Sequence, residues 1–274
     1  MNIRKYSVPV LALLMGVMTI SCGKKQVQET ETMTEMSIDT MEEVETEVTE
    51  IQQEYAGFDY EIMTVDGSRK DDNGNVLAAI YMQYPHIKGG SDAADAINEY
   101  YMDICTHYSP LNSGLFEYLD EAIAQGDMSV FPYEDYYGCT VGRNDGEYLS
   151  VVRNYVWYAG GVMNCGNLGE TFDAHTGAKV TLLDLYPDLT EDAVRQKVVD
   201  AVQTAISADP DSFYPEDGYL TGALAVIGEY EVEEYNFYMA DGKVYVCFGP
   251  YEIGYGGYGK DIVIDTYDED APAE

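Results

Sequence analysis

The sequence predicts an α+β fold: antiparallel sheets with packed helices, arranged as two closely associated subdomains. Short apolar runs occur in pairs around turn signals such as Asp241-Gly242, a pattern typical of β-hairpins. Longer segments between these pairs repeat apolar residues at three- and four-residue steps, as helices with one buried face do. Because the helices are interspersed among hairpins and do not alternate strictly with strands, antiparallel sheets are favoured.

The first half of the folded region is expected to hold two hairpins and two helices. Turn-rich segments at 71–75 and 143–146 each separate a pair of strands. One helix opens at Ser91, has Asp92 in its first turn and ends near Pro110. The expected strands are 58–65, 76–84, 136–141 and 148–158, and the second expected helix is 115–124.

The second half is expected to hold strands around one long helix. Its clearest element is the helix 191–207, which places Val194, Val198 and Val202 on one face. His175-Thr176-Gly177 and Asp241-Gly242 mark turns between strands. The expected strands are 171–174, 180–185, 235–239, 243–249 and 261–266, and an acidic tail follows at 268–274.

The N-terminus has the order of charge and hydropathy that is typical of a secretory signal. Arg4 and Lys5 precede an apolar run at 8–20, which is shorter than the roughly 20 residues of a comfortable membrane span. Residues 1–21 are therefore expected to be a cleaved signal peptide. Residues 19–22 resemble the lipobox of bacterial lipoproteins, which implies a lipidated Cys22 and anchoring to a bacterial membrane. An ordinary signal peptide with an incidental Cys22 is the alternative.

Residues 22–55 are expected to be the lipidated cysteine and an acidic, disordered tether. Between residues 23 and 55 there are ten acidic residues and two lysines, and no aromatic residue precedes Tyr55. Such a segment cannot bury enough apolar surface to offset its ordering entropy, and self-repulsion extends it. A partner-binding helix is the alternative, because five apolar residues are spaced loosely along one helical face: Met33, Met36, Met41, Val44 and Val48.

The chain is strongly acidic and rich in tyrosine. It has 50 acidic residues against 14 lysines and arginines, a formal net charge of −36, and 26 tyrosines but one tryptophan. A surface of this charge repels nucleic acid, teichoic acid and anionic lipid headgroups, so these are excluded as partners. It favours cationic proteins or divalent metals as partners, or else serves only to keep a surface protein soluble.

Four cysteines follow Cys22, and we expect them to be buried free thiols. Their spacings of 34, 26 and 82 residues form no compact disulfide framework, and none belongs to a metal knuckle. At least one disulfide remains the alternative, because an even number of cysteines outside the cytoplasm permits pairing. The four are Cys105, Cys139, Cys165 and Cys247.

No catalytic, metal or cofactor site is expected. The three histidines are isolated in the sequence, whereas a catalytic metal site needs two that share one face. Gly254, Gly256 and Gly259 match G-x-G-x-x-G by spacing, but no helix follows to receive a phosphate. The remaining catalytic alternative is a hydrolase with a carboxylate pair.

Several motifs carry a resemblance to a known family. Residues 84–89, Tyr-Pro-His-Ile-Lys-Gly, resemble the opening of the PdaC-like domain of polysaccharide deacetylases. Residues 158–161, 170–185 and 248–259 resemble the RsiV-like domain that follows it. In this order, the motifs resemble the extracytoplasmic region of RsiV-type anti-sigma factors. The resemblance implies a PdaC-like domain at 56–160 and an RsiV-like domain at 161–267.

The resemblance implies a ligand-binding function, since RsiV-type regions bind lysozyme. We therefore expect an extracytoplasmic lipoprotein, not an enzyme, that binds a cationic protein such as lysozyme or another wall hydrolase, steered by its negative charge. A glycan-binding or peptidoglycan-binding accessory module is the alternative, with aromatic rings that stack on sugars; for these rings, packing in the core is the competing role. The expected ligand-binding residues are Tyr251, Glu252, Tyr255, Tyr258 and Trp157.

Overall fold

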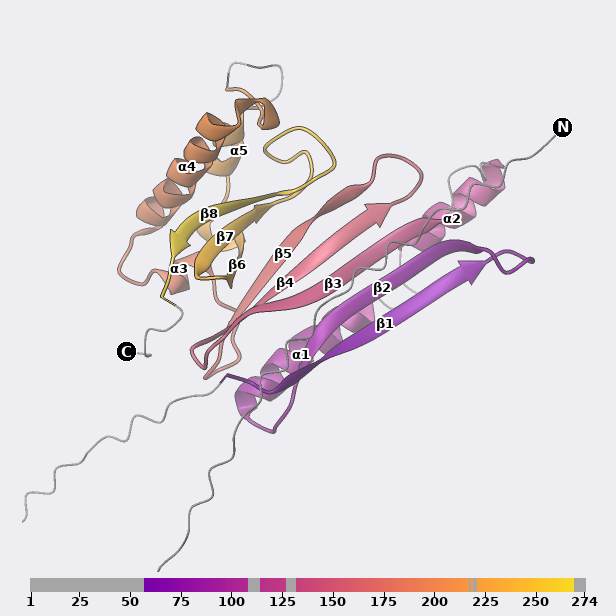
Figure 1. The fold of residues 1–274 in the computed structure, drawn as a ribbon, viewed down its shortest axis with the longest axis horizontal. Coiled ribbons are helices and arrows are strands. Elements are labelled where there is room, and N and C mark those ends of the chain that lie inside the picture. Colours follow the sequence, from indigo (N-terminus) through magenta and orange to yellow (C-terminus); the bar gives the residue numbers. More distant parts are fainter. Residues whose placement is uncertain (1–56, 108–113, 127–131, 217, 219–220, 269–274) are drawn as a thin grey trace, which may run out of the picture. The chain divides into compact units, whose positions relative to one another are not determined.

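The computed structural model describes residues 57–107, 114–126, 132–216, 218 and 221–268, all within one compact unit (Figure 1). The expected signal peptide, Cys22, the tether and nearly all of the acidic tail lie outside the described residues. The architecture confirms the predicted α+β class, because two sheets rich in antiparallel pairs pack with helices.

The first sheet has five strands in the order β1-β2-β3-β4-β5, which is also their order along the chain. Every neighbouring pair is antiparallel except β2 and β3, which run parallel. This pair corrects the expectation of purely antiparallel sheets. Two helices lie between β2 and β3 in the sequence, and such a crossover returns the chain to the same end of the sheet. The strands are β1 (Tyr60–Lys70), β2 (Val76–Ile87), β3 (Tyr133–Asn144), β4 (Tyr148–Tyr158) and β5 (Asn164–Asp173).

The two crossover helices, α1 (Asp92–His107) and α2 (Gly114–Gln125), cover one face of the first sheet. The apolar face of α1 places Ile97 and Tyr101 in a cluster with Met82 of β2 and Leu149 of β4. Leu115, Phe116 and Leu119 of α2 pack in a second cluster with Ala78 and Ile80. Burial of a large apolar side chain contributes about 1.5–3 kcal/mol, so these two stripes of side chains hold the helices on the sheet.

The second sheet has three antiparallel strands in the order β6-β7-β8. They are β6 (Asn236–Ala240), β7 (Lys243–Phe248) and β8 (Lys260–Thr266). Helix α4 (Glu191–Ala208) is capped by Thr190, whose side chain accepts from the Ala193 N–H, and buries Val194, Val198 and Val202 against this sheet. Figure 1 shows α4 and α5 (Ala223–Gly228) beside β6–β8.

The two sheets meet backbone to backbone where β6 lies against β3, β4 and β5. A Cβ atom at Gly169 of β5 would collide with the Phe237 carbonyl of β6, and one at Gly142 would collide with the Met239 carbonyl. The Met239 N–H donates to Ser150 Oγ at 2.7 Å. Glycines and a small hydroxyl therefore let the second sheet approach the first without a layer of large side chains.

Three segments close the outer edge of β5. From the loop between β7 and β8, the Gly257 carbonyl accepts from Cys165 N at 2.7 Å, and Gly259 N donates back to the Cys165 carbonyl at 2.7 Å. From β6, the Asn236 side chain accepts from Gly169 N. From the segment after β5, Val180 N donates to the Thr171 carbonyl at 2.8 Å. At this edge, both backbone groups of Cys165, the Gly169 N–H and the Thr171 carbonyl are thus bonded within the protein.

The second half of the chain differs from the sequence-based expectation in three places. The strand expected at 180–185 is wrong: Thr181 and Asp184 form a capping box that starts the short helix α3 (Leu182–Leu185), and only Lys179 bridges Phe172 of β5. Strand β5 begins at Asn164, earlier than the expected 171. Helix α5 and the 3-10 turns η1 (Pro210–Ser212) and η2 (Val232–Glu234) had no expected counterpart.

Two further features bear on the domain and membrane expectations. The expected domain boundary at residue 160 falls in the turn between β4 and β5, which are neighbours in one sheet. Within the described part of the chain, no helix is both long and apolar enough to cross a bilayer.

Candidate functional site

The loop between β7 and β8 presents most of the expected ligand-binding side chains. We call residues 250–259 the tyrosine loop. Tyr251, Tyr255 and Tyr258 are all exposed, and Tyr258 has 72% of its surface accessible. Tyr251 itself adopts the left-handed region at φ 62°, and Gly256 has φ 96°. The loop is therefore bent to a shape that an ordinary chain of non-glycine residues rarely adopts.

One side of the tyrosine loop is anchored on the segment after η1. Tyr214 N donates to the Ile253 carbonyl and the Tyr214 hydroxyl donates to the Tyr251 carbonyl, both at 3.1 Å. The Tyr255 ring meets the Tyr214 ring edge to face, with centroids 4.8 Å apart. Ile253 is fully buried below them. These contacts hold Tyr251 and Tyr255 outward at defined positions.

The other side of the loop is anchored on the first sheet. Gly257 and Gly259 make the two hydrogen bonds to Cys165, and Tyr258 between them forms a parallel bridge with the same residue. A Cβ atom at Gly257 would collide with the Met163 carbonyl and would lie 3.0 Å from Val162 Cγ1. The loop is therefore fixed between the two sheets and directly against the turn that joins β4 to β5.

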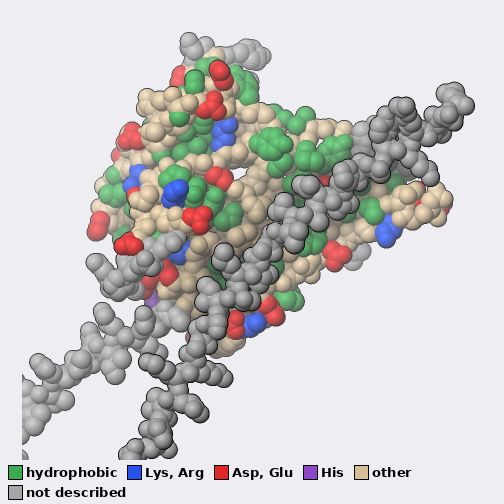
Figure 2. All heavy atoms as spheres, viewed as in Figure 1, with side chains coloured by type: hydrophobic (Ala, Val, Ile, Leu, Met, Phe, Trp, Pro, Cys, Tyr) green, Lys and Arg blue, Asp and Glu red, His purple; other side chains and the backbone are tan. Residues whose placement is uncertain are grey.

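This contact assembles an exposed apolar surface from two segments far apart in the sequence. Val162 and Met163 of the β4–β5 turn are exposed, as are the three tyrosines of the loop. Figure 2 shows hydrophobic side chains gathered over the region where the loop and this turn lie. We call the five residues the aromatic patch: Tyr251, Tyr255, Tyr258, Val162 and Met163. Exposed apolar groups gathered in this way are typical of interaction sites.

Beside the tyrosine loop lies an acidic hollow of about 160 Å³, lined among others by Glu252, Glu234 and Tyr155. The Glu252 carboxylate accepts a hydrogen bond from Gly249 N, and its partial burial raises its pKa above the ordinary value. Tyr155 passes over Gly166, where a Cβ atom would lie 2.9 Å from the tyrosine hydroxyl oxygen. Burial first, and then the negative charge of Glu252, raise the pKa of Tyr155. The hollow is thus suited to a cationic group and not to an anion.

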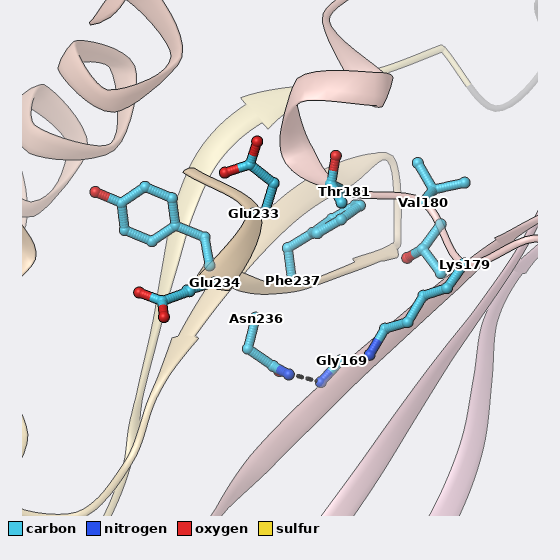
Figure 3. A pocket seen from close by; sticks show the side chains of 10 residues that line it. Gly169, Lys179, Val180, Thr181, Glu233, Glu234, Asn236 and Phe237 are labelled. Carbon is cyan, nitrogen blue, oxygen red and sulfur yellow. Dashed lines mark hydrogen bonds between the residues drawn. The ribbon is translucent and has the colours of Figure 1, made fainter. Parts of the chain in front are cut away.

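A neighbouring hollow of about 200 Å³ lies between β5 and the η2–β6 segment (Figure 3). Glu233 and Glu234 line one side of it and Lys179 the other, while Asn236 bonds the Gly169 backbone at its floor. Glu234 lines both hollows. The exposed carboxylates of η2 therefore continue the negative surface from Glu252 away from the tyrosine loop.

The structure places Trp157 apart from the other expected ligand-binding residues. Tyr251, Glu252, Tyr255 and Tyr258 share one loop, whereas Trp157 lies on β4 and packs with the α2 cluster. Its ring meets that of Tyr118 on α2 edge to face at 5.8 Å. Strand alternation turns this side chain toward the helix-covered face of the sheet, where it serves packing.

Sequence reasoning missed Val162, Met163, Tyr155 and Glu234 as neighbours of the loop. Val162 and Met163 follow a Gly-Gly pair in the turn, but their place in the patch depends on the contact between Cys165 and Tyr258, which are 93 residues apart in the sequence. No local pattern reveals a contact of that separation. In the sequence, Tyr155 looks like an ordinary strand residue. Only the structure shows that its ring lies over Gly166, which has no side chain.

A second charged cluster is enclosed beneath α1. The Arg153 guanidinium and the Glu170 carboxylate form a buried ion pair, and the Tyr100 hydroxyl donates to Glu170 Oε1 at 3.0 Å. Burial, and then the charge of Glu170, raise the pKa of Cys139 to about 12, so this thiol stays protonated. The described cysteines are all free, and no group of three or more metal-binding side chains is assembled among the described residues.

The fold is similar to those of two solved structures. A member of the DUF3298 family from Bacteroides fragilis is 15% identical to this chain, with a TM-score of 0.53 and coverage of 77% of this chain and 91% of the other. A DUF3298 family protein from Pseudomonas aeruginosa is 14% identical, with a TM-score of 0.48 and the same coverage. At this identity, the first similarity shows a shared fold alone. No family model and no curated protein matches the sequence.

Proposed function

We propose that this chain is an exported lipoprotein whose folded part binds a cationic protein through the aromatic patch and the adjoining acidic hollow. The observation that carries the proposal is the fixed tyrosine loop, which holds three exposed tyrosines next to the Glu252 carboxylate. Aromatic anchors commonly supply much of the energy of a protein interface, and a neighbouring charge of opposite sign supplies orientation.

The charge of the chain supports a basic partner. A formal net charge of −36 accelerates the encounter with a cationic protein and repels an anionic one. A lysine or arginine side chain of the partner would enter the acidic hollow, while its apolar surface would cover the patch. Together with the resemblance to RsiV-type regions, this favours lysozyme or a basic wall hydrolase as the partner. The proposed activity is binding and not catalysis.

The proposal is tested by titrating the purified folded protein with lysozyme in a calorimeter at low and physiological salt. Replacing Tyr255 and Tyr258 by alanine is expected to weaken binding by a total of roughly 2 kcal/mol, mainly through faster dissociation. Tyr118→Ala is the matched control, because Tyr118 is a tyrosine with 54% exposure on α2, away from the loop.

Two results would count against the proposal. Absence of heat at low salt with folded wild-type protein would remove lysozyme as the partner. Equal affinity losses in the Tyr118 variant and the loop variant would remove the aromatic patch as the binding surface. Circular dichroism of each variant separates lost binding from lost folding.

A further inference from the structure

We propose that the face of the first sheet opposite α1 and α2 holds a second binding site, a groove between Tyr136 and Tyr258 that takes an uncharged sugar chain. The site uses β3, β4 and β5 where they emerge from beneath the second sheet. It borders the aromatic patch at Tyr258 and is otherwise built from different residues, so it stands independently of the protein-binding function proposed above.

One wall of the groove is a stacked pair of tyrosines. Tyr81 of β2 and Tyr136 of β3 are directly opposite each other in the parallel ladder, and their rings stack at 5.0 Å with an angle of 2° between their planes. The Tyr136 ring leans along its strand over Gly138, where a Cβ atom would lie 3.0 Å from the hydroxyl oxygen. Because Tyr81 covers one face of Tyr136, the other face is turned toward β4. Tyr136 remains 39% exposed.

The floor and the far wall of the groove begin beside the uncovered face of the Tyr136 ring. Gly138 is paired with Asn154, Asn154 with Asn167, and Val156 with Cys165, so these side chains share one face of the sheet with Tyr136. Asn154, Val156 and Asn167 line a hollow of about 300 Å³ that is closed on its other side by Tyr258 and Asp261. The absence of a side chain at Gly138 makes room for the Tyr136 ring beside this hollow.

The polar groups of the floor are already oriented by one another. The Asn154 amide N–H donates to Asn167 Oδ1 at 2.6 Å, and the Asn167 amide N–H donates to Asp261 Oδ2. The Tyr238 hydroxyl donates to the same Asp261 oxygen at 3.0 Å. This chain of bonds fixes both amides before any ligand arrives, which reduces the entropy lost on binding.

An aromatic face beside ordered amides fits the chemistry of a pyranose ring. The C–H face of a sugar packs on an aromatic ring, and its hydroxyl or acetamido groups exchange hydrogen bonds with amide and carboxylate oxygens. Few well-placed polar groups beside apolar walls are the usual composition of a small-ligand site. The net charge of −36 and Asp261 within the hollow repel acidic sugars, so the ligand is an uncharged glycan.

Calorimetry of the folded protein with chitotetraose and cellotetraose tests this site, with an oligogalacturonate as the anionic comparison. Binding of at least one neutral tetrasaccharide in the millimolar range or tighter is expected, and none of the oligogalacturonate. Tyr136→Ala is expected to weaken that binding about tenfold, the equivalent of one stacking contact. Gly138→Ala, which pushes the Tyr136 ring from its position, is expected to weaken it by a smaller factor. Tyr118→Ala, on the opposite face, is expected to leave it unchanged.

The inference is overturned if wild-type protein binds neither neutral sugar, or if folded Tyr136→Ala binds as the wild type does. Preference for chitotetraose over cellotetraose would indicate that the Asn154 and Asn167 amides bind an acetamido group of the sugar. Lysozyme binding by the Tyr136 variant is measured in parallel. Tyr136 lies outside the aromatic patch, so its replacement is expected to leave the affinity for lysozyme unchanged. The sugar site and the proposed protein site can then be tested separately.

Discussion

Arg153 Nη2 lies 2.7 Å from Glu170 Oε1, and the two side chains are only 8% and 3% exposed. The pair joins β4 to β5 beneath α1, and the Tyr100 hydroxyl adds a bond from the helix to the same carboxylate. Glu170 Oε2 and two nitrogens of Arg153 are buried without a hydrogen-bond partner. A buried pair of this kind need not add much stability, but loss of either partner leaves a charge that water cannot reach.

Glu170→Gln should therefore destabilise the protein by about 3–5 kcal/mol, because the Arg153 charge is left unpaired in the core. Urea denaturation at neutral pH measures the free energy of unfolding. Asp120→Asn is the matched control: Asp120 pairs with Arg69 at 2.6 Å on the surface, and its loss should cost no more than about 1 kcal/mol. Equal losses in the two variants would contradict this account of the buried pair.

Asp135 on β3 should make stability fall as the pH rises. Burial raises the pKa of this carboxyl from 3.8 to about 6 in the folded protein. Since the folded pKa lies above the unfolded one, the associated stability is fully present below pH 4 and is lost as the pH passes through 6. Asp135→Asn should thus stabilise the protein at pH 8 by roughly 2–3 kcal/mol and by less at pH 5. Urea midpoints at both pH values measure this, and a gain independent of pH would refute the assignment.

Gly257→Ala should displace the tyrosine loop without unfolding the protein. The new Cβ atom would collide with the Met163 carbonyl, so the loop must move away from the β4–β5 turn. Lysozyme affinity is expected to fall about tenfold, measured by calorimetry, if the loop geometry presents the patch. Gly161→Ala in the same turn is the control, since a Cβ atom there meets nothing within 4 Å. An unchanged lysozyme affinity in folded Gly257→Ala protein would show that binding does not depend on the geometry of the loop.

Cys22→Ala should release the protein from membranes or leave it unprocessed. The expectation comes from the signal-like N-terminus and the lipobox resemblance, since stable anchoring requires the acyl chains that Cys22 would carry. Fractionation of cells that express the two forms, with immunoblotting for size, measures it. Membrane retention with normal processing in the variant would be incompatible with lipidation at Cys22.

Local patterns predicted most of the elements but not how they meet. Turn signals located the β1–β2, β3–β4 and β6–β7 hairpins, and apolar spacing located α1, α2 and α4. The parallel pairing of β2 with β3 spans a crossover of more than 40 residues, and its direction depends on the path of two helices. Thr181 and Asp184 override an apolar run that reads as a strand, because their reciprocal bonds start a helix.

At the candidate site, too, local sequence patterns predicted the loop but not the residues that pack against it. Glycines around Tyr251, Tyr255 and Tyr258 marked the loop from the sequence alone. The partners of the loop, Val162 and Met163, could not be identified because a long-range strand bridge sets them beside it. Likewise, the stack of Tyr81 on Tyr136 requires the β2–β3 register, which no pattern within either strand specifies.

The hydrogen bonds along the outer edge of β5 also affect the tendency of copies of the chain to aggregate. An edge strand with free backbone groups is a template for a strand from a second molecule, and thereby for aggregation. At β5 the tyrosine loop, Asn236 and Val180 bond the backbone of Cys165, the Gly169 N–H and the Thr171 carbonyl. The opposite edge, β1, carries acidic and basic side chains along its exposed length, including Glu61, Asp66, Arg69 and Lys70, which discourage strand addition. The loop that presents the tyrosines thus also covers part of the edge at which the sheet could grow into a neighbouring molecule.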